Sequence, residues 1–143
     1  MAVGKTLEEI EIGAFAERMH TVTEQDIQAF ADVSGDHNPV HLDADFAATT
    51  PFKGRIAHGM LSGAYISAAI AGDLPGPGSI YISQTLSFRR PVRLDDTVVT
   101  RVTVTAVDPD KARVTLKTEC FVNAKTVVEG EAVVMVPRQG ASA

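Results

Sequence analysis

The sequence has a single cysteine, Cys120, among 143 residues, and its acidic residues outnumber its basic ones. One cysteine excludes an intrachain disulfide and a metal site built from several thiolates. The formal net charge of −5 argues against nucleic acid as a partner, because phosphate backbones bind basic surfaces. A local basic patch for one small phosphorylated ligand is still compatible with this charge.

Long apolar runs are also missing. No segment approaches the roughly 20 apolar residues that cross a bilayer, and the N-terminal stretch MAVGKTLEEIEIG lacks the apolar block of a signal peptide. We therefore expect a soluble protein of the reducing cytoplasm, without a membrane partner. The length suits one domain, residues 1–143, which neither an internal repeat nor a linker divides.

Helical signals dominate the first half of the chain. In TEQDIQAFADVSG, Thr23 can cap the N-terminus of a helix, and Gly35 suits the left-handed residue that ends one. A short helix capped by Asp43 is expected next, in DADFAATT. The segment from Met60 to Ala71 is apolar on nearly every side, which predicts a helix with few exposed faces.

A two-residue period replaces the helical pattern after Gly78. It predicts strands over residues 79–88, 97–106, 112–122 and 125–136, and one further strand over 14–22. Short connections between the four later strands predict an antiparallel meander with one buried face. Such a sheet, wrapped around the long helix, gives an α+β fold. One sheet leaves part of the helix and one strand edge uncovered, and dimerisation would cover both.

The stretch SGDHNPVH carries the first candidates for catalysis. Gly35 ends a helix and Pro39 keeps the preceding residue extended, so the turn could aim Asp36 and His41 at one point. A carboxylate beside an imidazole can take a proton from water and return it. An Asx-type loop with a surface histidine fits the same residues, with Asn38 bonding to its own turn. The spacing alone leaves both interpretations open.

The apolar helix begins at HGML without an obvious capping side chain. Its first amides still need acceptors, and the positive end of the helix dipole favours an anion or a developing oxyanion. Gly59 would let a ligand come close to these amides. The alternative is that a main-chain carbonyl or a water accepts from them.

The remaining histidines carry weaker signals. Asp36, His41 and His58 form a conceivable metal site, but their spacing matches no helical metal motif, so we expect no metal. His20 and His37 are expected as an ordinary strand residue and an ordinary loop residue.

The stretch FADVSGDHNPVHLD, followed by HGML, resembles the hydratase 2 motif of (R)-specific enoyl-CoA hydratases, which belong to the MaoC-like dehydratase family. The resemblance covers nearly the whole chain, and it is strongest to the short bacterial hydratases that supply polyhydroxyalkanoate synthesis. It implies a hot-dog fold and a homodimer or higher assembly. It also implies reversible syn hydration of trans-2-enoyl-CoA to (R)-3-hydroxyacyl-CoA, without a cofactor.

The resemblance further implies roles for single residues. Asp36 and His41 would form the catalytic pair, and the Gly59 amide would hold the thioester oxygen. The residues expected to shape the site are Asn38, Pro39, His58 and Met60, and those expected in the acyl pocket are Ser62 and Ser67. The candidates for the phosphates of coenzyme A are Lys53, Arg55, Arg89, Arg90 and Arg93.

Three other functions share parts of this pattern. A (3R)-hydroxyacyl-ACP dehydratase of fatty acid synthesis uses the same chemistry on an acyl carrier protein. A hot-dog thioesterase would need a carboxylate on the central helix, which has none before Asp73. A non-catalytic acyl-CoA-binding regulator would need a DNA-binding segment, for which the chain has no room.

Overall fold

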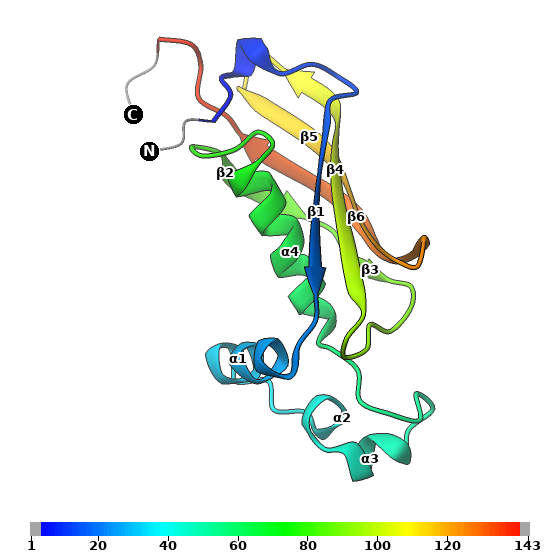
Figure 1. Ribbon diagram of the computed structural model, residues 1–143. Helices are drawn as coiled ribbons and strands as arrows, with labels where there is room; N and C mark the ends of the chain where they lie inside the picture. The colour runs from blue at the N-terminus through cyan, green and yellow to red at the C-terminus, as the bar shows by residue number, and fades with distance from the viewer. Residues whose placement is uncertain (1–3, 141–143) are drawn as a thin grey trace.

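The computed structural model describes residues 4–140 and consists of a six-stranded sheet with one long helix against it (Figure 1). The helices are α1 (Glu24–Ser34), α2 (Pro39–Leu42), α3 (Ala44–Ala48) and α4 (Gly59–Gly72), and a 3-10 turn, η1 (Leu7–Glu9), precedes them. The strands are β1 (Phe15–Thr21), β2 (Ile80–Gln84), β3 (Ser87–Phe88), β4 (Thr97–Asp108), β5 (Arg113–Val122) and β6 (Lys125–Met135). This arrangement confirms the predicted α+β class.

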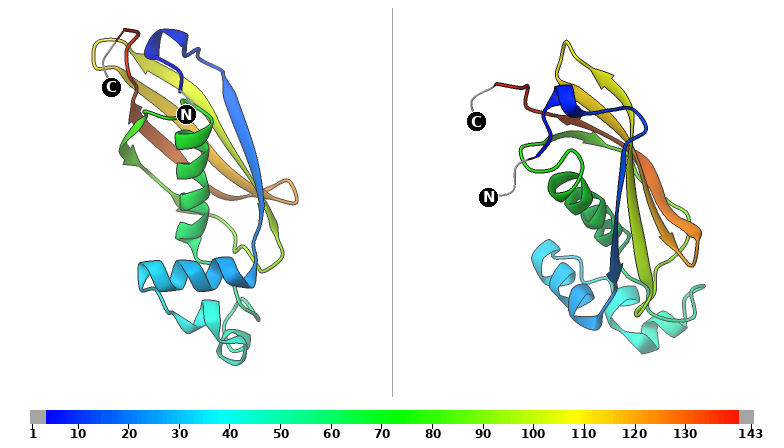
Figure 2. Two further views of the ribbon diagram at one scale, coloured as in Figure 1. Left: turned by 60° about the vertical axis from the view of Figure 1, so that its left-hand side comes forward. Right: turned by 45° about the horizontal axis from the view of Figure 1, so that its top comes forward.

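The sheet is antiparallel throughout and has the order β1-β4-β5-β6-β2, with β3 also paired to β6. It curves, and α4 lies against its concave face (Figure 2). Alternate residues of β4 and β5 are buried, as the two-residue period predicts. Val102 and Leu116 from these strands belong to the same buried core as Ile66 of α4.

The local helix signals behave as predicted. The Thr23 hydroxyl accepts from the Asp26 amide at 3.1 Å, and the Asp26 carboxylate accepts from the Thr23 amide at 3.0 Å. Gly35 ends α1 with φ of 79°, the left-handed conformation that glycine adopts without strain. The Asp43 carboxylate caps α3 in the same way as Thr23 caps α1. Helix α1 therefore delivers the chain to Asp36 in a defined direction.

The predicted four-strand meander is wrong in two respects. Residues 79–88 form two strands rather than one, and both pair with β6, so only β4, β5 and β6 form a meander. A Cβ on Gly130 of β6 would collide with the carbonyl oxygen of Thr85, so this glycine lets the break between β2 and β3 sit against β6. Residues 89–96, extended at about 3.3 Å each, can carry the chain back across the sheet to β4.

The predicted burial of α4 and β2 is also only partly met. Ile80, Tyr81 and Ile82 of β2 are exposed, at 55%, 39% and 41%. On α4, Ala64 and Ala68 face outward on one side of a helix that was expected to be covered almost everywhere. For α4 the reason is that one sheet covers only one side of a helix.

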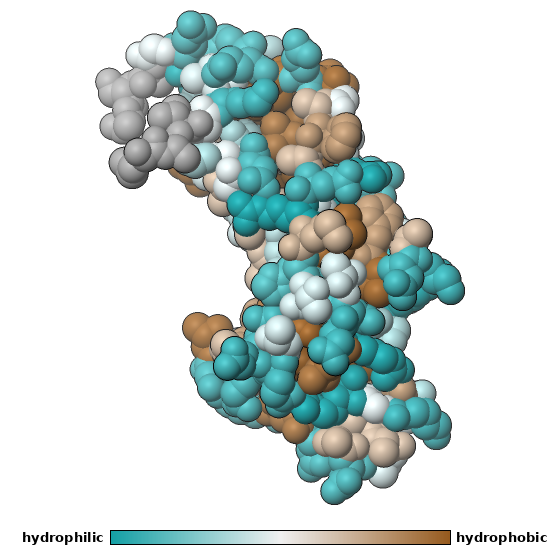
Figure 3. Space-filling model, in the orientation of Figure 1, coloured by the Kyte–Doolittle hydropathy of each residue, from teal (hydrophilic) through white to brown (hydrophobic). Residues whose placement is uncertain are grey.

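Helices α1, α2 and α3 gather beyond one end of the sheet, next to the N-terminal end of α4 (Figure 1). Hydrophilic and apolar residues are interspersed on the face drawn in Figure 3. Within residues 4–140, no helix combines the length and the apolar character needed to span a bilayer. The end of the sheet at which the helices meet is where the candidate catalytic residues lie.

Candidate active site

The turn between α1 and α2 is shaped by its own polar side chains. The Asp36 carboxylate accepts from the Asn38 amide at 3.2 Å, and the Asn38 side chain accepts from the Val40 amide at 3.2 Å. Pro39 occupies the first position of α2, where its missing N–H costs nothing. Asn38 and Pro39 therefore do shape the turn, which carries Asp36 exposed at its start and His41 in the short helix that follows.

The His41 ring is tied to a main-chain carbonyl. Its side chain is buried, with 8% of the residue exposed, and Nδ1 lies 2.8 Å from the Ile56 carbonyl oxygen. A carbonyl only accepts, so Nδ1 carries the proton and Nε2 keeps its lone pair. Burial lowers the pKa of His41, and nearby His58 lowers it further, while the Ile56 carbonyl and Asp36 act in the opposite direction.

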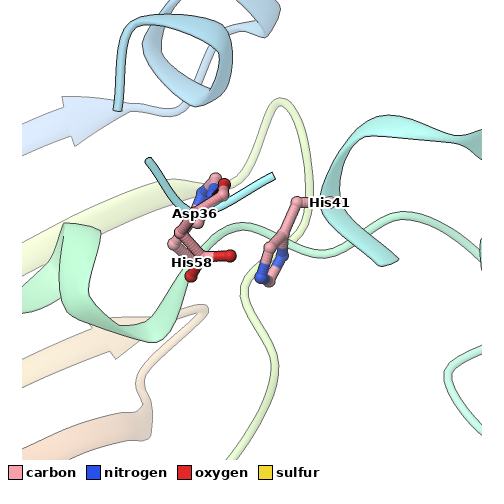
Figure 4. A group of neighbouring side chains, drawn as sticks. All are labelled: Asp36, His41 and His58. Carbon is pink, nitrogen blue, oxygen red and sulfur yellow. Dashed lines mark hydrogen bonds between the residues drawn. The ribbon is translucent and has the colours of Figure 1, made fainter. Parts of the chain in front are cut away.

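His58 joins these two residues from the N-terminal end of α4. Its Nε2 lies 3.0 Å from the main-chain carbonyl oxygen of Asp36, and its ring lies face to face with that of His41, with centroids 3.9 Å apart. Figure 4 shows the three side chains meeting from three segments of the chain. Their potential ligand atoms lie within 4.8 Å of one another. Because imidazole lone pairs lie in the ring plane, two stacked rings are badly oriented for one shared metal ion.

The N-terminal end of α4 has His58 at the cap position, and no side chain caps it. Its first amides, at Gly59 and Met60, lie at the positive end of a helix that is fourteen residues long. The absence of a side chain at Gly59 has a packing reason that the sequence did not reveal. A Cβ there would lie 2.7 Å from two carbons of the Phe88 ring.

A cavity of about 440 Å³ opens between this helix end, the Asp36–His41 turn and the strand region beyond β3. Asp36, His41, His58 and Gly59 all line it. Most of the remaining lining is apolar and comes from segments far apart in the sequence: Phe52, Ile56, Ala57, Phe88, Pro91, Val92 and Val128. None of these residues was predicted for the site, because no local sequence pattern marks a residue that faces a cavity. Such a lining strengthens electrostatic contacts inside the cavity.

The other predicted site residues divide into two groups. Met60, Ser62, Arg89 and Arg90 line the cavity. Ser67, Lys53, Arg55 and Arg93 lie outside its lining.

The two cavity arginines have their own partners. Arg89 pairs with Glu129 at 2.8 Å, and Arg90 donates to the Thr126 carbonyl at 2.6 Å. Both keep donor groups at the rim, where an anion could bind.

Arg55 is tied into the scaffold of the site. Its Nε donates to the carbonyl of His41 at 2.7 Å, and its guanidinium pairs with Glu24 of α1 at 2.8 Å. The Ile56 amide also donates to the Val40 carbonyl at 3.3 Å. Residues 55–58 thus hold the Asp36–His41 turn from one side. For Arg55 this is a role that its sequence pattern did not predict. The donors of Arg55 are engaged here, while Arg93 donates to the Phe52 carbonyl at 2.6 Å.

His20 lies in β1 and His37 in the loop after α1, as expected, and neither lines this cavity. His20 pairs with Asp26 at 2.8 Å, and its ring lies 4.7 Å from that of Tyr65. His37 is exposed and lies 3.4 Å from Asp32. These histidines therefore take no part in the site.

Comparison with known proteins agrees with this arrangement. The family model described as "MaoC like domain" matches residues 8–130. The (R)-specific enoyl-CoA hydratase of Rhodospirillum rubrum is 53% identical over 93% of this chain and 92% of its own. The crystal structure of the R-hydratase PhaJ1 from Pseudomonas aeruginosa superimposes with a TM-score of 0.90 at 55% identity, over 95% of this chain and 88% of that one. The mitochondrial 3-hydroxyacyl-[acyl-carrier-protein] dehydratase of Arabidopsis thaliana is 34% identical over 93% of this chain and 80% of its own.

Proposed function

Since the chain belongs to the MaoC-like family, with the hot-dog fold, we propose that its cavity catalyses the reversible hydration of trans-2-enoyl-CoA to (R)-3-hydroxyacyl-CoA. The observation that carries this proposal is the meeting of Asp36, His41 and the uncapped end of α4 in one cavity. An acid–base pair and an oxyanion donor are the two kinds of group that this reaction needs.

The reaction adds water across the C2–C3 double bond. The Asp36 carboxylate and His41 Nε2 can only accept hydrogen bonds, so one water can direct its two protons at them and its lone pair at C3. As the C3–O bond forms, the π electrons move to C2 and the thioester oxygen gains enolate charge. The Gly59 amide at the helix end donates to this oxygen.

The proton released by the water is then transferred to C2. In this proposal Asp36 accepts that proton and delivers it, while His41 orients the water. Both new bonds form on the face of the substrate that the water occupies, so the addition is syn. The product is (R) because, in this proposal, the substrate presents to the water the face of C3 whose attack gives the (R) configuration, as the similarity to (R)-specific hydratases supports. In reverse, the same groups remove the proton from C2 and hydroxide from C3. No metal or redox cofactor is needed in these steps.

The two ends of the substrate would occupy different parts of the site. Arg89 and Arg90 at the rim are our preferred contacts for the phosphates of coenzyme A, because both line the cavity. Lys53 is exposed and follows Phe52, which lines the cavity, so it is a secondary candidate. The acyl chain would enter past Met60 and Ser62 and follow α4 towards Ser67, which lies further along the helix.

We also propose that the enzyme is a cytoplasmic homodimer. The exposed edge strand β2 and the outward side of α4 support this, because both are apolar in a single chain. A second copy placed against β2 would continue the sheet and cover these groups.

The main alternative is a (3R)-hydroxyacyl-ACP dehydratase, which the similarity to the plant mitochondrial enzyme favours. The same cavity would then act on an acyl chain carried by a protein. A thioesterase is less well supported, because α4 carries no carboxylate and Asp73 at its far end pairs with Arg18.

The test is to mix the purified protein with crotonyl-CoA and follow the loss of the conjugated thioester absorbance, and then to determine the product's chirality. We expect rapid loss and an (R) product, with no free thiol detected. Inactivity across short and medium chains, or an (S) product, would overturn the proposal. A much higher kcat/KM with crotonyl-ACP would favour the alternative carrier, and release of thiol would indicate a thioesterase.

A further inference from the structure

The His58 side chain is more deeply buried than either member of the catalytic pair. Only 2% of the residue is exposed, compared with 8% for His41, while Asp36 is exposed. A buried imidazole is costly unless its polar atoms are satisfied, so its contacts identify its role.

The first contact fixes the main chain of Asp36. His58 Nε2 lies 3.0 Å from the Asp36 carbonyl oxygen, which can only accept, so the proton of the neutral ring sits on Nε2. Nδ1 then carries the lone pair, and it has no hydrogen-bond partner among residues 4–140. The other main-chain tie of Asp36 is its amide, which donates to Ser34 in the preceding helix at 3.1 Å. His58 therefore secures the Asp36 peptide from the side of α4.

The second contact fixes the ring of His41. The two rings are stacked with centroids 3.9 Å apart and planes 29° apart. On another side, the Phe30 ring of α1 lies 4.9 Å from His58. The His58 ring thus touches α1 and α2 while its main chain starts α4.

We propose that His58 is a positioning residue for the hydration, which holds Asp36 through its carbonyl and His41 through its ring. The inference depends on the proposed function for its kinetic consequence, but its structural content can be tested without turnover. The titratable and charged groups that face the His41 ring and main chain are Asp36, His58 and Arg55. Among these, only Asp36 exchanges a proton with the reacting water in the proposed mechanism, while His41 orients that water.

Two substitutions separate the two contacts. His58→Gln keeps an N–H donor near the position of Nε2 but removes the ring, and His58→Phe keeps a ring but removes the donor. Loss of the contact with the Asp36 carbonyl should lower the rate more than loss of the ring, because a displacement of about 1 Å near the reacting groups costs about 10²-fold in rate. For crotonyl-CoA we expect kcat of the Phe variant to fall by about 10²-fold with little change in KM. The kcat of the Gln variant should be at least about tenfold higher than that of the Phe variant. His37→Gln is the matched control, because His37 belongs to the same turn but is exposed, and it should keep wild-type kinetics.

Three outcomes would overturn the inference. The first is equal loss in the Gln and Phe variants, and the second is near-wild-type activity in both. The third is the disappearance in the Gln variant of one limb of the pH profile of kcat/KM, because that limb would then belong to His58 as a proton carrier.

A measurement on the unaltered protein covers the case in which a variant does not fold. Nitrogen-15 NMR of histidine-labelled protein should show a proton on Nε2 of His58, because its contact with the Asp36 carbonyl requires a donor there. A His58 ring whose only proton lies on Nδ1 would contradict the proposal. If the wild type is inactive on every enoyl thioester, the proposed function fails while this NMR result still decides how His58 holds the turn.

Discussion

Replacing Gly59 by alanine should disturb the site through one defined collision. The new Cβ would lie 2.7 Å from two ring carbons of Phe88, whereas carbon atoms pack at about 3.5–4.0 Å. The ring must therefore move by about 1 Å, which it can do because 55% of Phe88 is exposed. Overpacking costs about 1–3 kcal/mol, and the helix preference of alanine over glycine returns about 0.5–1 kcal/mol.

We therefore expect Gly59→Ala to lower the free energy of unfolding by roughly 0–2.5 kcal/mol, measured by urea denaturation followed by circular dichroism. Its effect on catalysis should be larger, because the Gly59 amide and the displaced Phe88 ring both belong to the cavity. A loss of about 10²-fold in kcat/KM with crotonyl-CoA is expected.

The double variant Gly59→Ala/Phe88→Ala tests the reason. If the collision causes the loss of stability, the double variant will be more stable than the sum of the single effects by about 1 kcal/mol. Gly63→Ala is the matched control on the same helix: its Cβ would meet the flexible end of Leu86 at 3.2 Å, so it should lose less stability and less activity. Additive stability effects in the cycle, or full activity in Gly59→Ala, would refute this reasoning.

Other substitutions and a pH series test the remaining parts of the site. Asp36→Asn and His41→Ala should each lose most of the turnover with unchanged circular dichroism, and near-full activity of Asp36→Asn would remove it as the base. Because the pKa of folded His41 is lowered, the unfolded chain binds more protons there. The stability contributed by this group should thus be complete above its unfolded pKa of about 6.5 and decline in urea titrations at lower pH. Arg55→Lys should lower kcat rather than raise KM, because Arg55 holds the His41 carbonyl. Arg89→Ala should raise KM in a salt-dependent way if Arg89 contacts phosphate. A raised KM in Arg55→Lys together with a lowered kcat in Arg89→Ala would contradict both roles.

Much of the fold could be predicted because its signals are local. Thr23 and Gly35 mark the ends of α1 by interactions within a few residues, and alternation in β4 and β5 depends only on neighbouring positions. The position of residues 79–88 could not be obtained this way. Their pairing with β6 depends on a close approach at Gly130 and on a connection that crosses the sheet.

The same distinction applies to the site. Gly35 and Pro39, which lie beside them in the sequence, marked Asp36 and His41 as candidates, but the turn was equally compatible with a surface loop. The resemblance to the hydratase 2 motif assigned them as a catalytic pair. The contacts of Arg55 and His58 could not be predicted from local patterns, because each depends on partners fourteen or more positions away. The resemblance placed His58 among the residues that shape the site, but it did not indicate which groups His58 holds. Arg55 was therefore interpreted by its charge alone, as a phosphate ligand. Its Glu24 partner comes from the other end of α1, which no local pattern connects to it.

The anchoring of the catalytic turn by residues 55–58 has a consequence for how the enzyme fails on heating. Helices α2 and α3 have four and five residues, too few to persist without tertiary contacts, and they lie beyond the end of the sheet. This region should open as a local unit while the sheet and α4 remain folded. Enzyme inactivation should then occur at a lower temperature than the loss of β-sheet signal. Bound acyl-CoA should bring these two temperatures closer together, because it binds only the form in which α2 and α3 are folded. The working range of the catalyst would accordingly depend on substrate concentration more than on the stability of its sheet.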